Sequence, residues 1–597
     1  MNSYRTHTCS ELRAANIGKP TTLIGWVDSV RDHGGVIFID LRDRSGITQV
    51  VFHPEVNQDV AKASQQLRSE DMIQISGTVA ARLKTDTVDT TNADLPTGEI
   101  EVSADTLNVI NKADVLPFQL DRALSNEDLR LKYRFLDLRR PAMARNMQIR
   151  HRVTKATRDY LDEHGFLEIE TPILSKSTPE GARDFLVPSR LAPGKFYALP
   201  QAPQQYKQLL MVAGMERYFQ IARCFRDEDL RADRQPEFTQ VDIEASFITP
   251  EDIYNLVEGL LKRVYKESLG VDIPTPFPRM TWKEAMDQYG SDKPERRFGM
   301  KLTDVSSIFE NSGFKVFASA VSNGGVVKAI NAKGFGSASV GQIDALTKTA
   351  VEAGAKGLAY IKVREEDWRS PISKFLSDEE KQKLTEALDI ETGDLVLFAA
   401  GPWEPSCDIL GRVRLQCAEF MELLKDNKER DFLWVIEFPL VGWDEEEQRW
   451  VAIHHPFTRP VKEDEQKLLS GELSADLRAQ AYDVVLNGTE LGGGSIRIHE
   501  RDLQSAMFKA LGITEEQARE QFGHILDAFS FGAPPHGGLA LGLDRLGMMI
   551  CNAESIREVI AFPKNNRGAD LMSDSPAAAE DRQLRDIHIQ VKLPAKK

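Results

Sequence analysis

The chain has 597 residues, 41% of them hydrophobic, which excludes a single small binding module because one domain commonly holds about 100–200 residues. Lys and Arg number 75 and Asp and Glu 91, so the formal net charge is −16, which argues against indiscriminate binding to nucleic acid but allows a local basic surface. No apolar run approaches the about 20 residues of a membrane helix and the start has no signal-peptide core, so we expect a cytoplasmic protein without membrane contact.

The first 111 residues predict a small β-barrel. Strand-like segments bounded by turn residues recur there, with one short helical stretch near Val60 to Leu67. A closed barrel of the oligonucleotide-binding (OB) type is the expected fold, and a generic β-sandwich is the alternative because strand count does not separate the two. The predicted strands are 22–30, 36–42, 47–52, 72–80 and 99–110.

A basic segment follows a polar hinge at 112–135. Residues 130–158 contain ten Lys or Arg and a single acid, Asp137. This run is either a solvated face with acidic partners or a surface that contacts phosphates. The helical pattern at 142–164 ends before Gly165, and 165–174 predicts a strand interrupted at Pro172, which places it at an edge or an interface.

A hairpin with a highly charged loop is predicted at 217–247. Counting by two along its second strand puts Phe238, Gln240, Asp242 and Glu244 on one face and apolar residues on the other. The loop is crowded with Arg, Asp and Glu from Arg226 onward, which suits arginines that bind a polyanion while carboxylates orient them.

Between 298 and 417 the chain alternates helices and strands with glycine pairs, which predicts a compact α/β insertion. Beyond it, Asp483 and Glu490 are hard oxygen ligands that suit Mg²⁺ on a nucleotide. The triple glycine 492–494 predicts either a structural bulge or close approach of backbone to a ligand. Adjacent His454 and His455 on a strand would point to opposite faces, so we do not expect them to share a metal ion.

The last signal is the segment 532–550. Its glycines precede a strand and a helix that place a single arginine, Arg545, beside a largely apolar run. An arginine there needs a partner or an anionic ligand, because an unpaired charge in apolar surroundings is costly.

Taken together, these segments resemble the three signature motifs of class II aminoacyl-tRNA synthetases. Over nearly its whole length the chain is similar to bacterial aspartyl-tRNA synthetases, with motif 1 around Pro172, motif 2 at FRDEDLRADRQPEF and motif 3 at GLALGLDR, where Asp544 replaces the more common Glu. The resemblance implies an α+β multidomain protein in which an OB-fold barrel precedes an antiparallel-sheet catalytic domain carrying the insertion. The implied parts are 1–111 for anticodon binding, 112–135 as hinge, 136–297 and 418–562 as catalytic domain, 298–417 as insertion, and 563–597 as C-terminal extension.

The resemblance also implies the site. Arg226, Arg545 and Glu490 would be catalytic, Phe238 would stack on adenine, and Asp483 with Glu490 would ligate Mg²⁺. The implied ATP contacts are Arg226, Asp227, Glu228, Gln235, Phe238, Glu490, Gly542, Leu543, Asp544 and Arg545. The implied aspartate contacts are Glu180, Gln204, Lys207, Arg226, Asp242, His454 and Arg497. Lys207 and Arg497 would favour aspartate over asparagine, because an amide would leave these cations without an anion.

The implied activity is ATP-dependent formation of aspartyl-adenylate and transfer of aspartate to tRNA(Asp) by a homodimer. His33, and a second position near Lys84, resemble the subtype that also charges tRNA(Asn); an enzyme specific for tRNA(Asp) is the alternative. Two other readings are an asparaginyl- or lysyl-tRNA synthetase, which the insertion and the Lys207 and Arg497 pair oppose, and a nucleic-acid-binding scaffold without activity. That scaffold would be expected to lack Arg226, Glu490 or Arg545.

Overall fold

The computed structural model describes residues 4–85, 88–120, 124–177, 182–229, 233–365 and 367–593. The chain divides into two compact units. The first comprises Met1–Arg145 and Ala569–Ser575, and the second comprises Asn146–Gly568 and Pro576–Lys597. Within the described ranges, no helix combines the length and the apolar character needed to cross a membrane.

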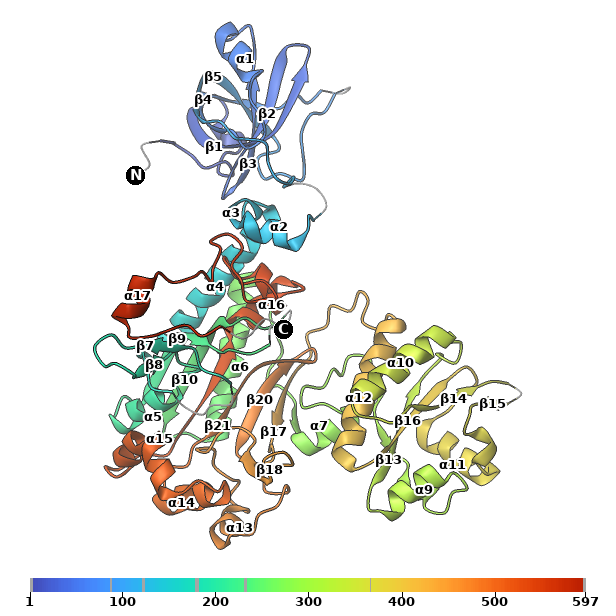
Figure 1. Cartoon of the computed structure of the whole chain (residues 1–597). Coiled ribbons are helices and arrows are strands. Elements are labelled where there is room, and N and C mark those ends of the chain that lie inside the picture. Colours follow the sequence, from blue (N-terminus) through green and yellow to red (C-terminus); the bar gives the residue numbers. More distant parts are fainter. Residues whose placement is uncertain are drawn as a thin grey trace. The chain divides into compact units, whose positions relative to one another are not determined.

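The first unit contains the predicted barrel (Figure 1). Its strands close in the order β1-β2-β3-β5-β4, so the prediction of a closed barrel is confirmed and the sandwich alternative is wrong. Burial alternates along β1, because successive side chains point to opposite sides of a strand. The elements are β1 (Pro20–His33), β2 (Val36–Asp43), β3 (Gly46–Phe52), α1 (Gln58–Ser64), β4 (Met72–Ala81), β5 (Ile100–Asn111), α2 (Glu127–Lys132) and α3 (Arg134–Asp137).

Much of the basic segment is paired inside the protein. Asp137 is fully buried, with Arg134 at 2.7 Å and two further arginines within 4 Å. Arg139 pairs with Glu70 at 2.8 Å. The first of the two alternatives, acidic partners within the chain, therefore accounts for a large part of this charge.

The second unit is built on an eight-stranded sheet in the order β11-β17-β20-β21-β22-β10-β9-β6. The five pairs from β17 to β9 are antiparallel, as predicted, and the outermost pair at each edge is parallel. The strands are β6 (Leu167–Glu168), β9 (Arg217–Phe225), β10 (Glu237–Ser246), β11 (Arg279–Thr281), β17 (Phe432–Ile436), β20 (Ala481–Leu486), β21 (Thr489–Ile496) and β22 (His536–Gly542).

One face of this sheet is apolar and covered by helices. The helices α4 (Pro141–Glu163) and α6 (Pro250–Leu269) lie behind it in Figure 1 and share a core with Val241, Ile243 and Val484. The residues that alternate with these, such as Asp242 and Asp483, face the other way. The periodicity of 2 in the sequence therefore separates a structural face from a polar one.

The predicted strand at 165–174 is much shorter than expected. Only Leu167 and Glu168 pair, in parallel with β9 at the sheet edge. The ladder thus ends before Pro172, which has no backbone N–H with which to resume it. Ile173 and Leu174, just beyond it, are 41% and 52% exposed.

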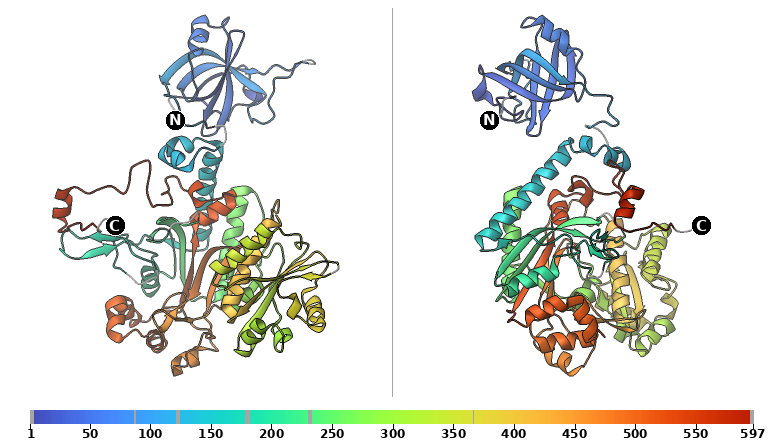
Figure 2. Two further views of the ribbon diagram at one scale, coloured as in Figure 1. Left: turned by 45° about the vertical axis from the view of Figure 1, so that its right-hand side comes forward. Right: turned by 60° about the vertical axis from the view of Figure 1, so that its left-hand side comes forward.

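The insertion forms its own five-stranded sheet, in the order β12-β13-β16-β14-β15, with helices alternating along the chain as predicted. All its strand pairs are antiparallel. Figure 2 shows it as a separate layer beside the larger sheet. Its elements are β12 (Thr303–Asp304), α8 (Ser306–Phe309), α9 (Lys315–Ser322), β13 (Val326–Ala332), α10 (Val340–Glu352), β14 (Ala359–Val363), β15 (Trp368–Arg369), α11 (Asp378–Leu388), β16 (Leu395–Gly401) and α12 (Trp403–Phe420).

The remaining elements surround the polar face of the large sheet or follow it in the chain. They are β7 (Leu186–Pro188), β8 (Phe196–Ala198), α5 (Gln204–Val212), α7 (Trp282–Tyr289), β18 (Val441–Asp444), β19 (Arg449–Ala452), α13 (Glu465–Ser470), α14 (Arg501–Ala510), α15 (Glu515–Phe529), α16 (Leu543–Cys551) and α17 (Asp581–Asp586).

Candidate active site

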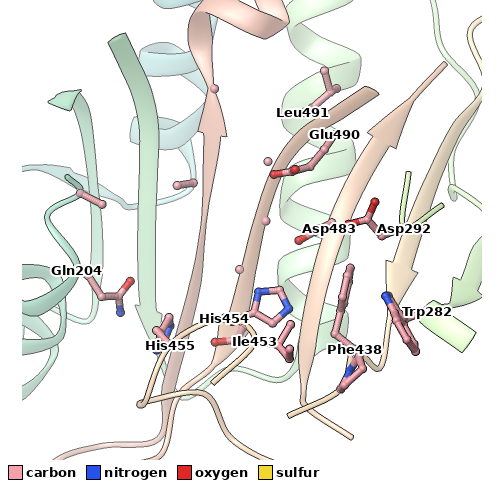
Figure 3. Close-up of a pocket in the computed structure, with 18 of the residues that line it drawn as sticks. Gln204, Trp282, Asp292, Phe438, Ile453, His454, His455, Asp483, Glu490 and Leu491 are labelled. Carbon is pink, nitrogen blue, oxygen red and sulfur yellow. The ribbon is translucent and has the colours of Figure 1, made fainter. Parts of the chain in front are cut away.

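A cavity of about 1640 Å³ lies on the polar face of the large sheet. It extends from Arg226 and Phe238 beside β9 and β10 to Trp282, which follows β11. Five strand spacings separate β10 from β11, or about 24 Å. Figure 3 shows Gln204 at one end and Trp282 at the other, with His454 between them. The cavity is thus long enough for a nucleotide and a second small ligand.

Most of the predicted site residues line this one cavity. Arg226, Glu490 and Arg545 come from distant parts of the chain and all do so. The other predicted residues in the lining are Gln204, Lys207, Glu228, Gln235, Phe238, Asp242, His454, Asp483, Arg497, Gly542 and Asp544. Leu543 packs its side chain into the core. Asp227 lies outside the lining, and Glu180 falls outside the described residues.

Arg226 follows β9 and has the properties of a free anion-binding group. Its guanidinium carbon lies 5.2 Å from the centre of the Phe238 ring. The buried Nε atom has no hydrogen-bond partner, and within the described residues the guanidinium forms no ion pair. An arginine held against an aromatic ring without a carboxylate partner is ready to bind phosphate or carboxylate.

Arg545, near the start of α16, is held by the neighbouring strand. It donates a hydrogen bond of 2.7 Å to the backbone carbonyl of Glu490, and its other terminal nitrogen lies 3.5 Å from Asp233. Asp544, beside it, accepts a bond from the backbone N–H of Thr239 and pairs with Arg150 at 2.5 Å. Asp544 therefore ties α16 to β10 while Arg545 projects into the cavity.

The Gln235 amide is used within the protein. It donates to the backbone carbonyl of Lys564 at 3.0 Å and accepts from the backbone N–H of the same residue at 2.8 Å. The Lys564 ammonium also binds Glu237 at 2.9 Å. The start of the predicted C-terminal extension thus fixes the end of the motif 2 loop, a role that sequence reasoning did not assign.

A β-bulge sets the direction of Glu490. Val484 pairs with Gly492, but the next residue, Val485, pairs with Glu490, so Leu491 is the extra residue. The bulge turns Glu490 to the side of the sheet on which Asp483 lies, and leaves Leu491 in the core. The predicted bulge is thus present, immediately before the triple glycine.

The triple glycine itself allows close backbone approach. A Cβ on Gly492 would lie 2.1 Å from the carbonyl of Ala540 on β22, and one on Gly493 would lie 2.0 Å from the Asp483 carboxylate. These positions exclude larger residues because of neighbouring protein atoms. The glycines therefore make room for the Asp483 side chain in the cavity.

Asp483 and Glu490 are carboxylates without donors. Within the described residues, neither side chain accepts a hydrogen bond or pairs with a cation, although Asp483 is only 8% exposed. Burial, then the charges of Glu490 and Asp292, raise the pKa of Asp483 well above its usual range. Figure 3 shows all three side chains in one part of the cavity. Sequence reasoning missed Asp292, which follows Gly290 in the polar segment after α7.

Four buried charges form the deepest part of the site. Lys207, on α5, lies 2.7 Å from Asp242 and 3.3 Å from Glu244. Arg497 binds Glu244 through two nitrogens at 2.9 and 3.1 Å. Although burial opposes it, Arg497 and Lys207 lower the pKa of Glu244 to about 2, whereas burial raises that of Asp242. The Tyr218 hydroxyl also acts on Asp242, and Asp242 lines the cavity as the carboxylate at its deep end.

His454 and His455 both line the cavity, although as neighbours on a strand they were expected to point to opposite faces. The chain bends at residues 453–454 after β19, so His454 and His455 both line the cavity (Figure 3). Arg497 donates to Nε2 of His455 at 2.6 Å. Burial, reinforced by Arg497, lowers the pKa of His454 to about 4 and that of His455 well below its usual value. Both rings are therefore neutral at pH 7.

In the first unit, the two positions predicted to select tRNA lie on the barrel. His33 ends β1 and makes an edge contact with Phe38, at 5.5 Å between ring centres. Lys84 follows β4 and pairs with Asp89 at 3.3 Å, with 70% of its side chain exposed.

Comparison with known proteins identifies both parts of the chain. Residues 126–566 match the family described as tRNA synthetases class II (D, K and N), and residues 21–110 match an OB-fold nucleic acid binding domain. A protein of Opitutus terrae, named aspartate–tRNA(Asp/Asn) ligase, is 55% identical over 99% of this chain and 100% of its own length. The protein of the same name in Bacillus subtilis is 54% identical over 99% of both chains.

A Geobacillus kaustophilus protein, also 54% identical over 99% of both chains, is named aspartate–tRNA ligase. Among solved structures, asparaginyl-tRNA synthetase of Pyrococcus horikoshii, complexed with asparaginyl-adenylate, has a TM-score of 0.59 at 20% identity, covering 93% of this chain and 97% of that one. A putative aspartyl-tRNA synthetase of Leishmania major has a TM-score of 0.58 at 18% identity, covering 95% of both. These two structures share the fold.

Proposed function

The chain belongs to the class II tRNA synthetases of the aspartate, lysine and asparagine group, and we propose that it is an aspartate–tRNA ligase acting on both tRNA(Asp) and tRNA(Asn). Full-length relatives that are 51–55% identical and named aspartate–tRNA(Asp/Asn) ligase support this proposal. An enzyme restricted to tRNA(Asp) is the alternative. The inactive-scaffold reading is opposed because Arg226, Glu490 and Arg545 are all present in one cavity.

The observation that carries the proposal is the arrangement of charges along that cavity. Arg226, which forms no ion pair within the described part of the chain, and Arg545, which lines the same cavity, suit phosphates. The buried cluster around Lys207 and Arg497 suits a small dicarboxylate, and the carboxylate of Asp242 in the cavity lining suits its ammonium group. A nucleotide and aspartate would thus lie in contact, as the first reaction requires.

The chemistry needs positioning more than a protein nucleophile. An oxygen of the aspartate α-carboxylate attacks the α-phosphorus of ATP, and pyrophosphate leaves. A ribose hydroxyl at the 3′ end of tRNA then attacks the carbonyl of the mixed anhydride, and AMP leaves. Arg226 would hold the α-phosphate and the carboxylate together, Arg545 would bind the γ-phosphate, and the Phe238 ring would stack on adenine.

Asp483 and Glu490 fit a magnesium ion that accompanies the nucleotide. Within the described residues neither carboxylate accepts a hydrogen bond and one is mostly buried, so a bound cation would offset the cost of holding the two charges there. Mg²⁺ prefers such oxygen ligands and commonly keeps several waters. The ion would supply charge neutralisation on the phosphates, and the two side chains would hold it.

Selection of aspartate over asparagine needs a different reason from the one first expected. Lys207 and Arg497 already have carboxylate partners before any ligand binds, so asparagine would not leave them without an anion. Both side chains offer only N–H donors, however. A substrate carboxylate accepts from them with either oxygen, whereas the NH₂ group of asparagine would face a donor and accept nothing.

Pyrophosphate exchange with a panel of amino acids tests the first step. With ATP and Mg²⁺, we expect exchange that depends on L-aspartate and is lower by about 10⁴-fold with asparagine or lysine. Exchange driven best by another amino acid would refute the proposed substrate.

Charging of purified tRNA(Asp) and tRNA(Asn) with labelled aspartate tests the second step. We expect both to be acylated, and absence of acylation of tRNA(Asn) would establish the alternative. Since His33 and Lys84 lie on the barrel, a His33→Leu variant should lose charging of tRNA(Asn) more than charging of tRNA(Asp), with aspartate-dependent exchange unchanged.

The proposal extends to assembly and organisation. Exposed Ile173 and Leu174 beside the short edge strand β6 suit a homodimer contact, for which sedimentation would give twice the mass of the chain. The division at residues 111, 135, 297, 417 and 562 also remains a proposal. Limited proteolysis should cut just after 111, where residues 112–117 form no helix or strand, and should spare 135 and 417, which lie inside α3 and α12.

A further inference from the structure

The segment after α7 brings a third carboxylate to the two proposed to hold magnesium. Asp292 lines the cavity, and Figure 3 shows it beside Asp483 with Glu490 close by. Its side chain is 43% exposed and pairs with Lys293 at 2.9 Å. Within the described residues, no three acidic or histidine side chains converge closely enough to hold one ion directly. Asp292 could therefore reach a cation at Asp483 through water, which suits the hydration that Mg²⁺ retains.

An independent observation points to a cation here. The Asp483 side chain lies more than nine-tenths buried, projects into the cavity over Gly493, and has no donor within the described part of the chain. A cation bound beside it would offset the cost of holding this unpaired carboxylate in a mostly buried position.

The insertion fixes the segment that carries Asp292. Gly290 ends α7 with a φ of 65° and is in direct contact with α12 of the insertion. A Cβ on Gly411 of α12 would lie 2.2 Å from the Gly290 carbonyl. Lys328, only 1% exposed on the insertion sheet, binds Asp287 of α7, and Trp403 donates to the same carboxylate at 3.0 Å. These contacts join the insertion to α7 immediately before Asp292.

We infer that Asp292 is a positioning residue for the hydrated cation at Asp483 and Glu490, and that the insertion holds it there through the contact between Gly290 and Gly411. The inference rests on the proposed function, since the cation is the one that accompanies ATP. The insertion would then contribute to the first reaction step by positioning Asp292, while the large sheet supplies the other charged residues of the site.

Binding of Mn²⁺ to the full-length protein, followed by electron paramagnetic resonance with a non-hydrolysable ATP analogue, tests the inference. We expect Asp292→Asn to weaken Mn²⁺ binding by about three- to tenfold, as for loss of one water-mediated charge. Gly411→Ala should weaken it similarly, because the added methyl group displaces the segment. Asp476→Asn makes the same change at an exposed carboxylate elsewhere in the cavity and is the matched control.

The outcomes separate the parts of the inference. Unchanged Mn²⁺ binding in Asp292→Asn overturns it, as does an equal loss in Asp476→Asn or an equal loss of analogue binding without metal. A loss in Asp292→Asn together with normal binding in a folded Gly411→Ala overturns the role of the insertion. If the unmodified protein shows no Mn²⁺-dependent binding of the analogue, the proposed magnesium site is refuted instead.

Discussion

Replacing Arg497 by leucine would test the proposed aspartate pocket most directly. Arg497 is 2% exposed and binds Glu244 at 2.9 and 3.1 Å, His455 at 2.6 Å and Ser495 at 2.7 Å. Its removal leaves Glu244 with Lys207 as its charged partner, at 3.3 Å. Breaking a buried ion pair from one side costs about 3–5 kcal/mol, so the variant should unfold at lower denaturant concentration.

The expected functional loss is larger and selective. Without the guanidinium donors, kcat/KM for aspartate in pyrophosphate exchange should fall by about 10⁴-fold, equivalent to about 5.5 kcal/mol. The dissociation constant for ATP, measured by calorimetry on the same folded protein, should stay within about threefold, because Arg226 and Arg545 bind the phosphates.

A double variant separates the two effects. Combining Arg497→Leu with Glu244→Gln removes the buried carboxylate that has lost one of its two cationic partners, so the free energy of unfolding should recover most of the loss while aspartate activation stays low. Equal losses for ATP and aspartate in folded Arg497→Leu, or recovery of activation in the double variant, would refute this account of the pocket.

Three further predictions concern the rest of the site. Arg226→Ala should lower aspartate-dependent pyrophosphate exchange by at least about 10³-fold, and a rate within threefold of the unmodified enzyme would remove this arginine from the mechanism. Burial and nearby positive charge lower the pKa of His454 to about 4, whereas its value in the unfolded chain is near 6.5, so the unfolded chain binds this proton more tightly. As the pH drops from 6.5 to 4, the free energy of unfolding of the ligand-free protein should therefore fall by up to about 3 kcal/mol from this group. His454→Asn should flatten the dependence of this free energy on pH over that range, and an unchanged profile would contradict the reasoning. Gly493→Ala would place a methyl group 2.0 Å from the Asp483 carboxylate and displace it. The Mg²⁺ concentration for half-maximal pyrophosphate exchange should therefore rise about tenfold, with KM for aspartate nearly unchanged. An unaltered Mg²⁺ requirement would refute Asp483 as a ligand of the ion.

Local patterns predicted much of the fold. The barrel strands and the motif 2 hairpin followed from alternation by two and from turn residues, because both signals are local. The segment 165–174 lies at the sheet edge, as its proline predicted, but its pairing is shorter than predicted because it ends at Glu168, before Pro172 is reached. Convergence of Arg226, Glu490 and Arg545 was predicted through family resemblance, since no local rule brings such distant segments together.

What could not be predicted depends on tertiary packing. Pairing of Lys207 and Arg497 with Asp242 and Glu244 involves contacts across three strands and a helix, so their charge state before ligand binding was not visible in the sequence. His455 was set aside because a strand was assumed where the chain bends. Asp292 lay in a short polar segment with no strong pattern, and only its position beside Asp483 reveals it.

The extra residue at Leu491 bends this strand without changing which residues face each other across it. Val485 lies opposite Glu490, so loss of Leu491 alone would leave Glu490 opposite Val485, next to Gly492 and still on the cavity side. The strand would lose its kink and its extra local twist. A one-residue gap at this position should therefore reshape the place where the two carboxylates meet while the sheet keeps its register.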